Sequence, residues 1–124
     1  MTLGEAIEII DKAQPNQIEY DEKVRWLSEM DGKVYHEILR THRGFEWVKY
    51  APFGPNTPQQ HPLLVPHPYD AVYLDYLEMR IADENREQVQ YNNALQKYTK
   101  KLQEYMDFVN RTFPTRRTRG FRLW

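Results

Sequence analysis

The sequence of 124 residues has no cysteine, only five glycines and no long apolar run. The absence of cysteine excludes disulfides, cysteine-ligated zinc and thiol catalysis. The glycines do not form a phosphate-binding loop, and the sequence has neither a GxSxG element nor an HExxH pair. No run approaches the ~20 apolar residues of a membrane span, and the N-terminus does not resemble a signal peptide. We therefore expect a soluble protein, made in a cytoplasm, that is not an enzyme and does not contact membrane.

The four histidines and the paired carboxylates show no recognisable catalytic or metal-ligating pattern. His36, His42, His61 and His67 are widely spaced, and no further metal ligands stand out beside them. Carboxylate pairs on predicted helix surfaces are usually solvated charges rather than acid–base pairs, and the pairs of this kind are Asp70/Asp75 and Asp83/Glu84. The sequence thus predicts no catalytic residue, no cofactor and no metal site.

The formal net charge of −1 conceals an uneven distribution. Residues 97–124 carry eight Lys or Arg against Glu104 and Asp107, a balance of +6, whereas residues 1–96 carry nine basic against sixteen acidic residues, a balance of −7. An acidic body with a basic end suggests docking on an acidic surface or on nucleic acid. A solubilising tail is the simpler alternative.

Two helices are predicted before residue 45. The first begins at a capping box formed by Thr2 and Glu5 and ends near Ala13, because Pro15 disfavours helix at the residue before it. The second is expected to begin at an Asp21 cap and to end just before Gly44. Their apolar faces are Leu3, Ala6, Ile7 and Ile10, and then Val24, Leu27, Met30/Asp31, Val34, Ile38 and Leu39, flanked by Trp26 and Tyr35.

Residues 45–68 hold six of the eight prolines, which effectively forbids helix. The stretch FEWVKYAPF favours one short extended piece, which could pair with residues 63–65 in a short edge ribbon. A loop this long is uncommon in a compact domain and is often functional. We interpret residues 45–67 as a projecting loop with apolar anchors; the alternative is a loop simply pinned to the helices by Trp47 and Phe53.

The stretch from Pro68 to Phe113 is too long for one helix in a compact domain of this size. Pro68 suits the first turn of a third helix, and residues 82–88 lack large apolar side chains, so we place a bend or break at 83–86. A fourth helix follows and ends before Pro114. The third helix is expected to face the core with Val72, Tyr73, Tyr76, Leu77 and Ile81; the fourth carries an inter-helix or inter-subunit seam of Tyr91, Leu95, Tyr98, Leu102, Tyr105 and Val109.

The last residues, TRRTRGFRLW, mix guanidinium groups with large apolar side chains. Such a segment can bind phosphates through charge or form an arm that orders on a partner. Apolar anchors are not needed for phosphate binding, which favours a protein partner. The predicted architecture is thus mainly α: a small bundle of about four helices over residues 1–113, with a projecting loop and an extended basic C-terminal arm at 114–124.

Three stretches carry a resemblance to a known family. They are KVRWLSEMDGKVYHEI, LLVPHPYDAVYLDYLEMRIA, and QYNNALQKY followed by FVNRT. In this order and spacing they resemble the head–tail connector, or adaptor, proteins of tailed bacteriophages, over roughly residues 1–113.

The resemblance implies a structural role in the virion neck. Such adaptors form a ring, usually of twelve copies, below the portal protein; the ring extends the DNA channel without sequence recognition and supports the next head-completion or tail protein. The portal-binding arm would then comprise Arg116, Arg117, Arg119, Phe121, Arg122, Leu123 and Trp124, and the loop contact to a neighbouring ring or subunit would comprise Trp47, Tyr50, Phe53 and His61. The alternatives are a small helical nucleic-acid-binding regulator that uses the Arg-rich end and, less well supported, a helical toxin, inhibitor or enzyme accessory module.

Overall fold

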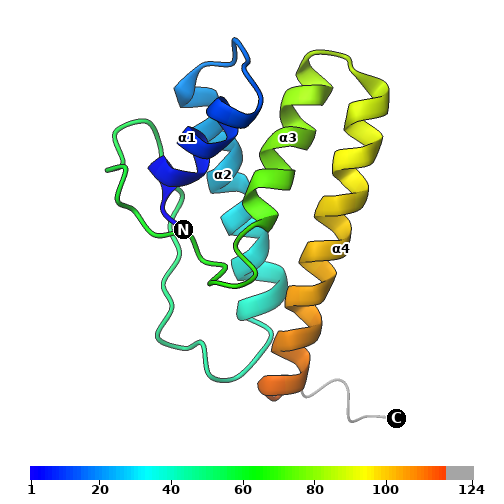
Figure 1. Ribbon diagram of the computed structural model, residues 1–124. Coiled ribbons are helices and arrows are strands. Elements are labelled where there is room, and N and C mark those ends of the chain that lie inside the picture. Colours follow the sequence, from blue (N-terminus) through cyan, green and yellow to red (C-terminus); the bar gives the residue numbers. More distant parts are fainter. Residues whose placement is uncertain (117–124) are drawn as a thin grey trace.

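The computed structural model describes residues 1–116 as a mainly helical protein. Its elements are α1 (Leu3–Ala13), α2 (Tyr20–Val34), a π-helical segment η1 (Tyr35–Leu39) that continues α2, α3 (Val72–Glu84) and α4 (Gln88–Thr112). Figure 1 shows α3 and α4 as an antiparallel pair, with α1 and α2 beside α3. The long segment between η1 and α3 loops out on the side of α1 and passes next to the N-terminus. The predicted count of about four helices is confirmed.

The first helix forms as its sequence predicts. The Thr2 hydroxyl accepts a hydrogen bond from the Glu5 amide, and the Glu5 carboxylate accepts one from the Thr2 amide, so both halves of the capping box are present. The helix ends at Ala13, before Pro15. Its apolar stripe is buried, and the members of the stripe are Leu3, Ala6, Ile7 and Ile10.

The second helix starts earlier than its sequence predicts. Glu19 is the N-cap, without a side-chain capping bond, and the helix begins at Tyr20, so the expected Asp21 cap is wrong. An upstream turn sets this start: the Asn16 side chain accepts a hydrogen bond from the Ile18 amide at 3.0 Å, and Ile18 and Tyr20 pack against the core. At the other end the helical segment stops at Leu39, several residues before Gly44.

The polar stretch at 82–88 contains a complete chain reversal, which confirms the predicted break. Helix α3 ends at Glu84 and α4 begins at Gln88, and Arg86 has a φ of 56° between them. The expected position of Pro68 in the first turn of α3 is wrong, because the helix begins only at Val72. Residues 66–71 form a separate turn, in which the Tyr69 amide donates to the Pro66 carbonyl at 2.8 Å. That turn packs the Tyr69 ring against Tyr105 of α4.

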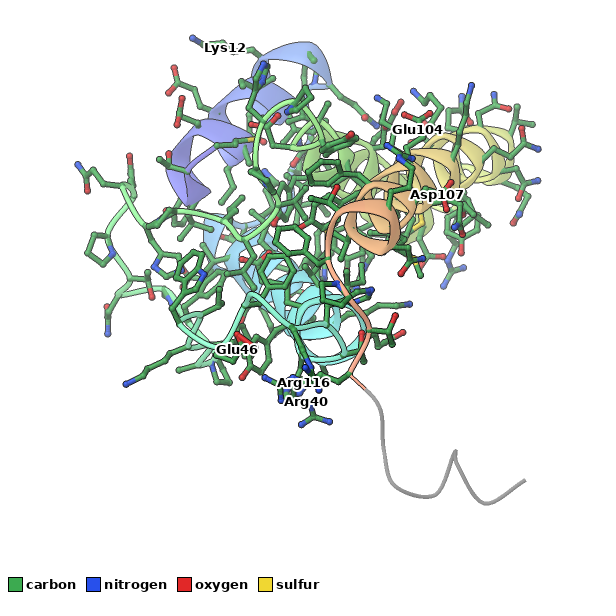
Figure 2. The ribbon with its side chains drawn as sticks, turned by 90° about the horizontal axis from the view of Figure 1, so that it is seen from below. Lys12, Arg40, Glu46, Glu104, Asp107 and Arg116 are labelled. Carbon is green, nitrogen blue, oxygen red and sulfur yellow. The ribbon has the colours of Figure 1, made fainter. Side chains whose placement is uncertain are left out.

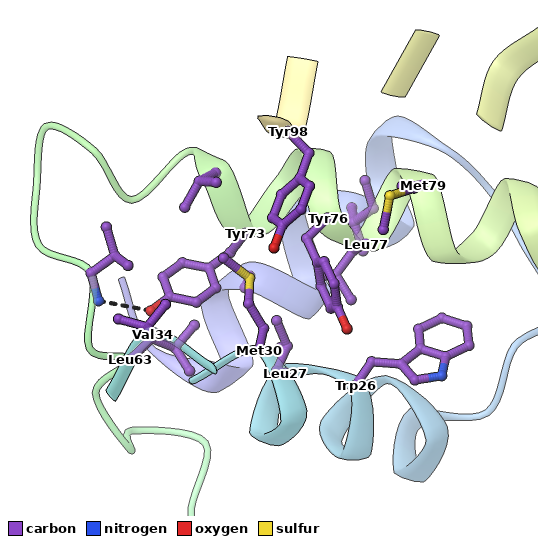
Figure 3. Close-up of a cluster of buried hydrophobic side chains, with 14 of the residues drawn as sticks. Trp26, Leu27, Met30, Val34, Leu63, Tyr73, Tyr76, Leu77, Met79 and Tyr98 are labelled. Atoms are coloured by element: carbon purple, nitrogen blue, oxygen red, sulfur yellow. Dashed lines mark hydrogen bonds between the residues drawn. The ribbon is translucent and has the colours of Figure 1, made fainter. Parts of the chain in front are cut away.

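The core lies between α2 and the α3–α4 hairpin (Figure 3). Trp26, Leu27 and Met30 of α2 face Tyr73 and Leu77 of α3, and all five are essentially inaccessible to solvent. The five core positions predicted for α3 are all buried: Val72, Tyr73, Tyr76, Leu77 and Ile81.

The proline-rich segment pairs with the N-terminus rather than with itself. The Leu3 amide donates to the His61 carbonyl at 2.8 Å and the Leu63 amide donates to the Met1 carbonyl at 3.0 Å, which forms an isolated bridge between Thr2 and Pro62. The predicted ribbon between FEWVKYAPF and residues 63–65 is therefore wrong for the part of the chain that the structure describes. Buried Leu63 and Val65 hold this end of the segment on the body.

Candidate interaction surfaces

The start of the predicted C-terminal arm is clamped to the turn that follows η1. The Arg43 amide donates to the Pro114 carbonyl and the Arg116 amide donates to the Thr41 carbonyl, both at 2.8 Å, which creates an antiparallel bridge between His42 and Thr115. Below this bridge the His42 ring lies 2.7 Å from both the Ile38 carbonyl and the Asn110 side-chain oxygen. We call residues 40–46 together with 113–116 the arm clamp.

Aromatic packing and a close backbone approach complete the arm clamp. The Phe113 ring lies 4.4 Å, centroid to centroid, from that of Phe45. Gly44 adopts a φ of +107°, and a Cβ placed on it would lie 2.7 Å from the Phe113 ring. Only glycine meets both conditions, because the left-handed backbone and the adjacent ring leave no room for a side chain. The turn after η1 thus holds residues 113–116 in place beyond the end of α4.

Several arginines lie at the arm clamp. Seen from below in Figure 2, Arg40 and Arg116 lie together beside Glu46, whose carboxylate is 3.7 Å from the Arg116 guanidinium. Arg43 belongs to the same turn, and Arg111 lies in the last turn of α4. The opposite end is acidic, around an open hollow whose lining includes Glu19, Asp21, Glu22 and Glu84. Arginines therefore gather around the arm clamp, and acidic side chains gather around the hollow at the far end of the body.

The remaining arm residues fall in 117–124, outside the described part of the chain. They are Arg117, Arg119, Phe121, Arg122, Leu123 and Trp124. Of the predicted arm set, the structure places Arg116 alone, in the arm clamp.

The four loop residues singled out from the sequence have different environments. Trp47 is 77% exposed, although its indole N–H donates to the Gly44 carbonyl at 3.0 Å. Tyr50 stacks on Tyr35 with centroids 5.7 Å apart and donates to the Ser28 carbonyl at 2.8 Å. The rings of Phe53 and His61 lie 4.6 Å apart. The Phe53 amide donates to the Ser28 hydroxyl at 3.0 Å. Tyr50 and Phe53 therefore both fasten the loop to α2, whereas the Trp47 indole bonds to nearby Gly44.

An apolar groove lies between residues 45–48 and residues 62–66. Its volume is about 330 Å³. Leu39 and Tyr105 contribute to its lining from the helical body, and the rest of the lining comes from Phe45, Trp47, Val48, Pro62, Leu63, Leu64 and Pro66. We call this feature the Trp47 groove. Sequence periodicity does not reveal it, because its walls come from four separate segments of the chain.

The predicted α4 seam divides between the protein's own core and solvent. Tyr98, Tyr105 and Val109 are buried, and burial raises the pKa of Tyr98 and of Tyr105 to about 12. These hydroxyls consequently stay protonated at any physiological pH. Tyr91 and Leu102 are half-buried, and Leu95 is exposed next to Gln96, Thr99 and Lys100 on the outward face of α4.

The buried carboxylate of Asp31 connects segments that are far apart in the sequence. Asp31 of α2 accepts hydrogen bonds from the Tyr73 hydroxyl at 2.5 Å and the Leu64 amide at 3.1 Å. The Tyr73 oxygen in turn accepts one from the Val65 amide at 2.7 Å, drawn as a dashed line in Figure 3. Burial raises the pKa of Asp31 to about 6, while the two hydrogen bonds act in the opposite direction.

The second buried carboxylate corrects a prediction from the sequence. Asp75 was expected on a solvated helix surface, but it is 6% exposed and pairs with Lys101 at 2.7 Å and with Lys97 at 3.8 Å across the α3–α4 hairpin. Asp70 is also mostly buried, and its carboxylate lies 3.3 Å from the N-terminal amino group. Asp83 and Glu84 are exposed, as predicted.

Within residues 1–116 we find no group of three or more His, Asp or Glu side chains placed to hold a metal ion. No helix in that range is long and apolar enough to cross a membrane. The chain matches no protein-family model, no curated protein and no solved structure. A function is therefore proposed from the interaction surfaces together with the resemblance carried by the three sequence stretches.

Proposed function

We propose that this chain is a structural subunit of the tailed-bacteriophage neck, a head–tail connector that forms a ring below the portal. The arm clamp is the observation that carries the proposal. It holds the start of an Arg-rich, aromatic arm beside Arg40 and Arg43 of the helical body, an arrangement that suits insertion of the arm into an acidic partner. The three sequence stretches that resemble connector proteins give the partner its identity as the portal protein.

The outward surfaces of the body supply places for ring neighbours. Trp47 of the loop and Leu95 of α4 are both exposed within residues 1–116. A ring requires heterologous contacts, in which one face of a subunit meets a different face of the next. The loop and the outward face of α4 are two such different faces. In this proposal neighbouring subunits are related by rotation about the DNA channel, and the next head-completion or tail protein docks on the ring.

The test is attachment to purified portal protein from the same particle. We expect the native chain to form rings on the portal in electron micrographs, and deletion of residues 117–124 to abolish attachment while leaving the arm clamp intact. Replacement of Phe121, Leu123 and Trp124 by Ala should weaken attachment at least ~30-fold, because buried aromatic anchors dominate interfaces.

A charge-matched control distinguishes the effect of the arm's arginines from the effect of lowering the overall positive charge. Arg117, Arg119 and Arg122 are replaced by Ala in one variant, and three exposed lysines of the body, Lys12, Lys49 and Lys100, are replaced in the other. We expect the arm variant alone to lose salt-dependent attachment. Unchanged attachment after deletion of residues 117–124 would refute the arm's role.

A second candidate function is binding of nucleic acid at the basic end. The gathering of Arg40, Arg43 and Arg116 in and beside the arm clamp favours this candidate, because clustered guanidinium groups bind phosphates through charge. It predicts salt-dependent binding of a short duplex that is lost when Arg116, Arg117, Arg119 and Arg122 become Ala. Absence of measurable binding at low salt would exclude a nucleic-acid-binding regulator and leave the connector.

A further inference from the structure

The Trp47 groove has the features of a peptide-binding site. Its volume of about 330 Å³ falls within the range of ligand sites, about 300–1,000 Å³. Its lining is almost wholly apolar and includes the aromatic rings of Phe45, Trp47 and Tyr105. Trp47 stands at the rim, 77% exposed, yet its indole N–H is held by the Gly44 carbonyl, so the ring is oriented before any ligand arrives. An exposed but fixed Trp beside an apolar hollow is a typical binding anchor.

The arm clamp places a suitable ligand beside this groove. Phe45, which lines the groove, packs against Phe113, and Glu46, next to Trp47 in the chain, pairs with Arg116. The described chain thus ends beside Phe45 and Glu46, next to the groove. The eight residues that follow can reach roughly 26 Å at about 3.3 Å per residue, far enough to cross the groove.

The sequence of those eight residues suits the groove chemically. They include three large apolar side chains, Phe121, Leu123 and Trp124, interrupted by Arg122. Exposure of three such side chains together is unfavourable in water. The groove offers apolar walls for them, and the Glu46 carboxylate at its edge suits a guanidinium.

We propose that the Trp47 groove is the docking site for the chain's own residues 121–124 in the free subunit. Attachment in the same chain favours this occupant over a second copy, because a short tether gives an effective concentration in the millimolar range. The arm then has two alternative positions, the groove before assembly and the partner afterwards.

The experiment compares full-length chains in solution without portal, so that its outcome does not depend on the connector proposal. In one variant Phe121, Leu123 and Trp124 are replaced by Ser while every Arg is retained. Methyl NMR follows Val48 and Leu64, which line the groove, and Val89, which is 68% exposed at the start of α4 and serves as the control. We expect the variant to shift the two groove methyls, through loss of aromatic ring currents, and to leave Val89 unchanged.

A peptide of residues 117–124 added in trans supplies the complementary test. It should restore the groove resonances of the Ser variant and leave the native chain unaffected, because the native groove is already filled. Trp47→Ala in the Ser variant should weaken peptide affinity tenfold or more, and Val89→Ala should not change it.

Several results would overturn the proposal. Identical groove resonances in the native chain and the Ser variant would show that residues 121–124 do not occupy the groove. Equal binding of the peptide by both chains would show that the native groove is open. Groove shifts that depend on protein concentration would assign the groove to a second copy. Equal binding of a peptide whose apolar residues are replaced by Ser would reduce the interaction to charge.

Discussion

Replacement of the buried Asp31 by Asn should change how the stability of this protein depends on pH. The Asp31 side chain is inside the protein, 1% exposed, and it joins α2 to Tyr73 of α3 and to the backbone at Leu64. Asn keeps the shape and an oxygen that can accept from Tyr73, but it does not ionise. The substitution therefore isolates the contribution of one carboxylate, because all other titratable groups are common to both proteins.

The magnitude follows from the pKa difference between the folded and unfolded chain. Burial raises the pKa of Asp31 from 3.8 to about 6. The folded protein therefore holds this proton more tightly than the unfolded chain, and the stabilisation is complete below pH 3.8 and lost as the pH rises through 6. The full effect is about 3 kcal/mol, of which roughly 2 kcal/mol falls between pH 4.5 and 7.5.

The assay is urea denaturation followed by circular dichroism at several pH values in that range. The free energy of unfolding of the native protein minus that of Asp31→Asn should fall by about 2 kcal/mol from pH 4.5 to pH 7.5. Asp83→Asn, at an exposed position, controls for the removal of one carboxylate. A native-minus-variant difference that stays constant with pH would refute the assignment of a raised pKa to Asp31.

Two further predictions concern glycines that face aromatic rings. Gly32→Ala should destabilise the protein by roughly 1 kcal/mol despite the helix preference of Ala, because the new Cβ would lie 2.9 Å from the Tyr50 hydroxyl. In a Tyr50→Phe background the same substitution should be neutral or stabilising, and equal losses in both backgrounds would contradict this explanation. Gly44→Ala should cost roughly 1–3 kcal/mol, since it strains a left-handed backbone and meets the Phe113 ring; hydrogen exchange should show faster exchange at the Arg116 amide, and unaltered protection there would argue against the arm clamp.

The helical elements were predictable where the signal is local. The Thr2–Glu5 capping box, the break near Arg86 and the apolar face of α3 all depend on residues within a few turns of one another. The helix starts at Tyr20 and Val72 were missed because turns upstream of each helix position the chain by tertiary packing, as the Tyr69 ring does against α4. Local propensity does not contain that information.

The interaction surfaces were less accessible to sequence reasoning. The partner of residues 61–63 is the N-terminus, about sixty residues away, so a ribbon partner sought among neighbouring residues could not be found. Asp31 stood out only as a carboxylate on an apolar helix face; its partners Leu64 and Tyr73 come from distant segments. The arm remains a prediction from composition, because most of it lies outside the described residues, and the turn that clamps residues 114–116 was not predicted.

The turn between α3 and α4 is a suitable site for inserting a label into this protein. Residues 83–90 are exposed, and the turn lies at the end of the hairpin opposite the arm clamp (Figure 1). Exposed turns whose backbone makes few tertiary contacts tolerate inserted sequence well. A short epitope or a fluorophore placed at Asn85–Arg86 would therefore label the protein far from the arm clamp. Such a label would report on binding partners without obstructing the arm clamp or the Trp47 groove.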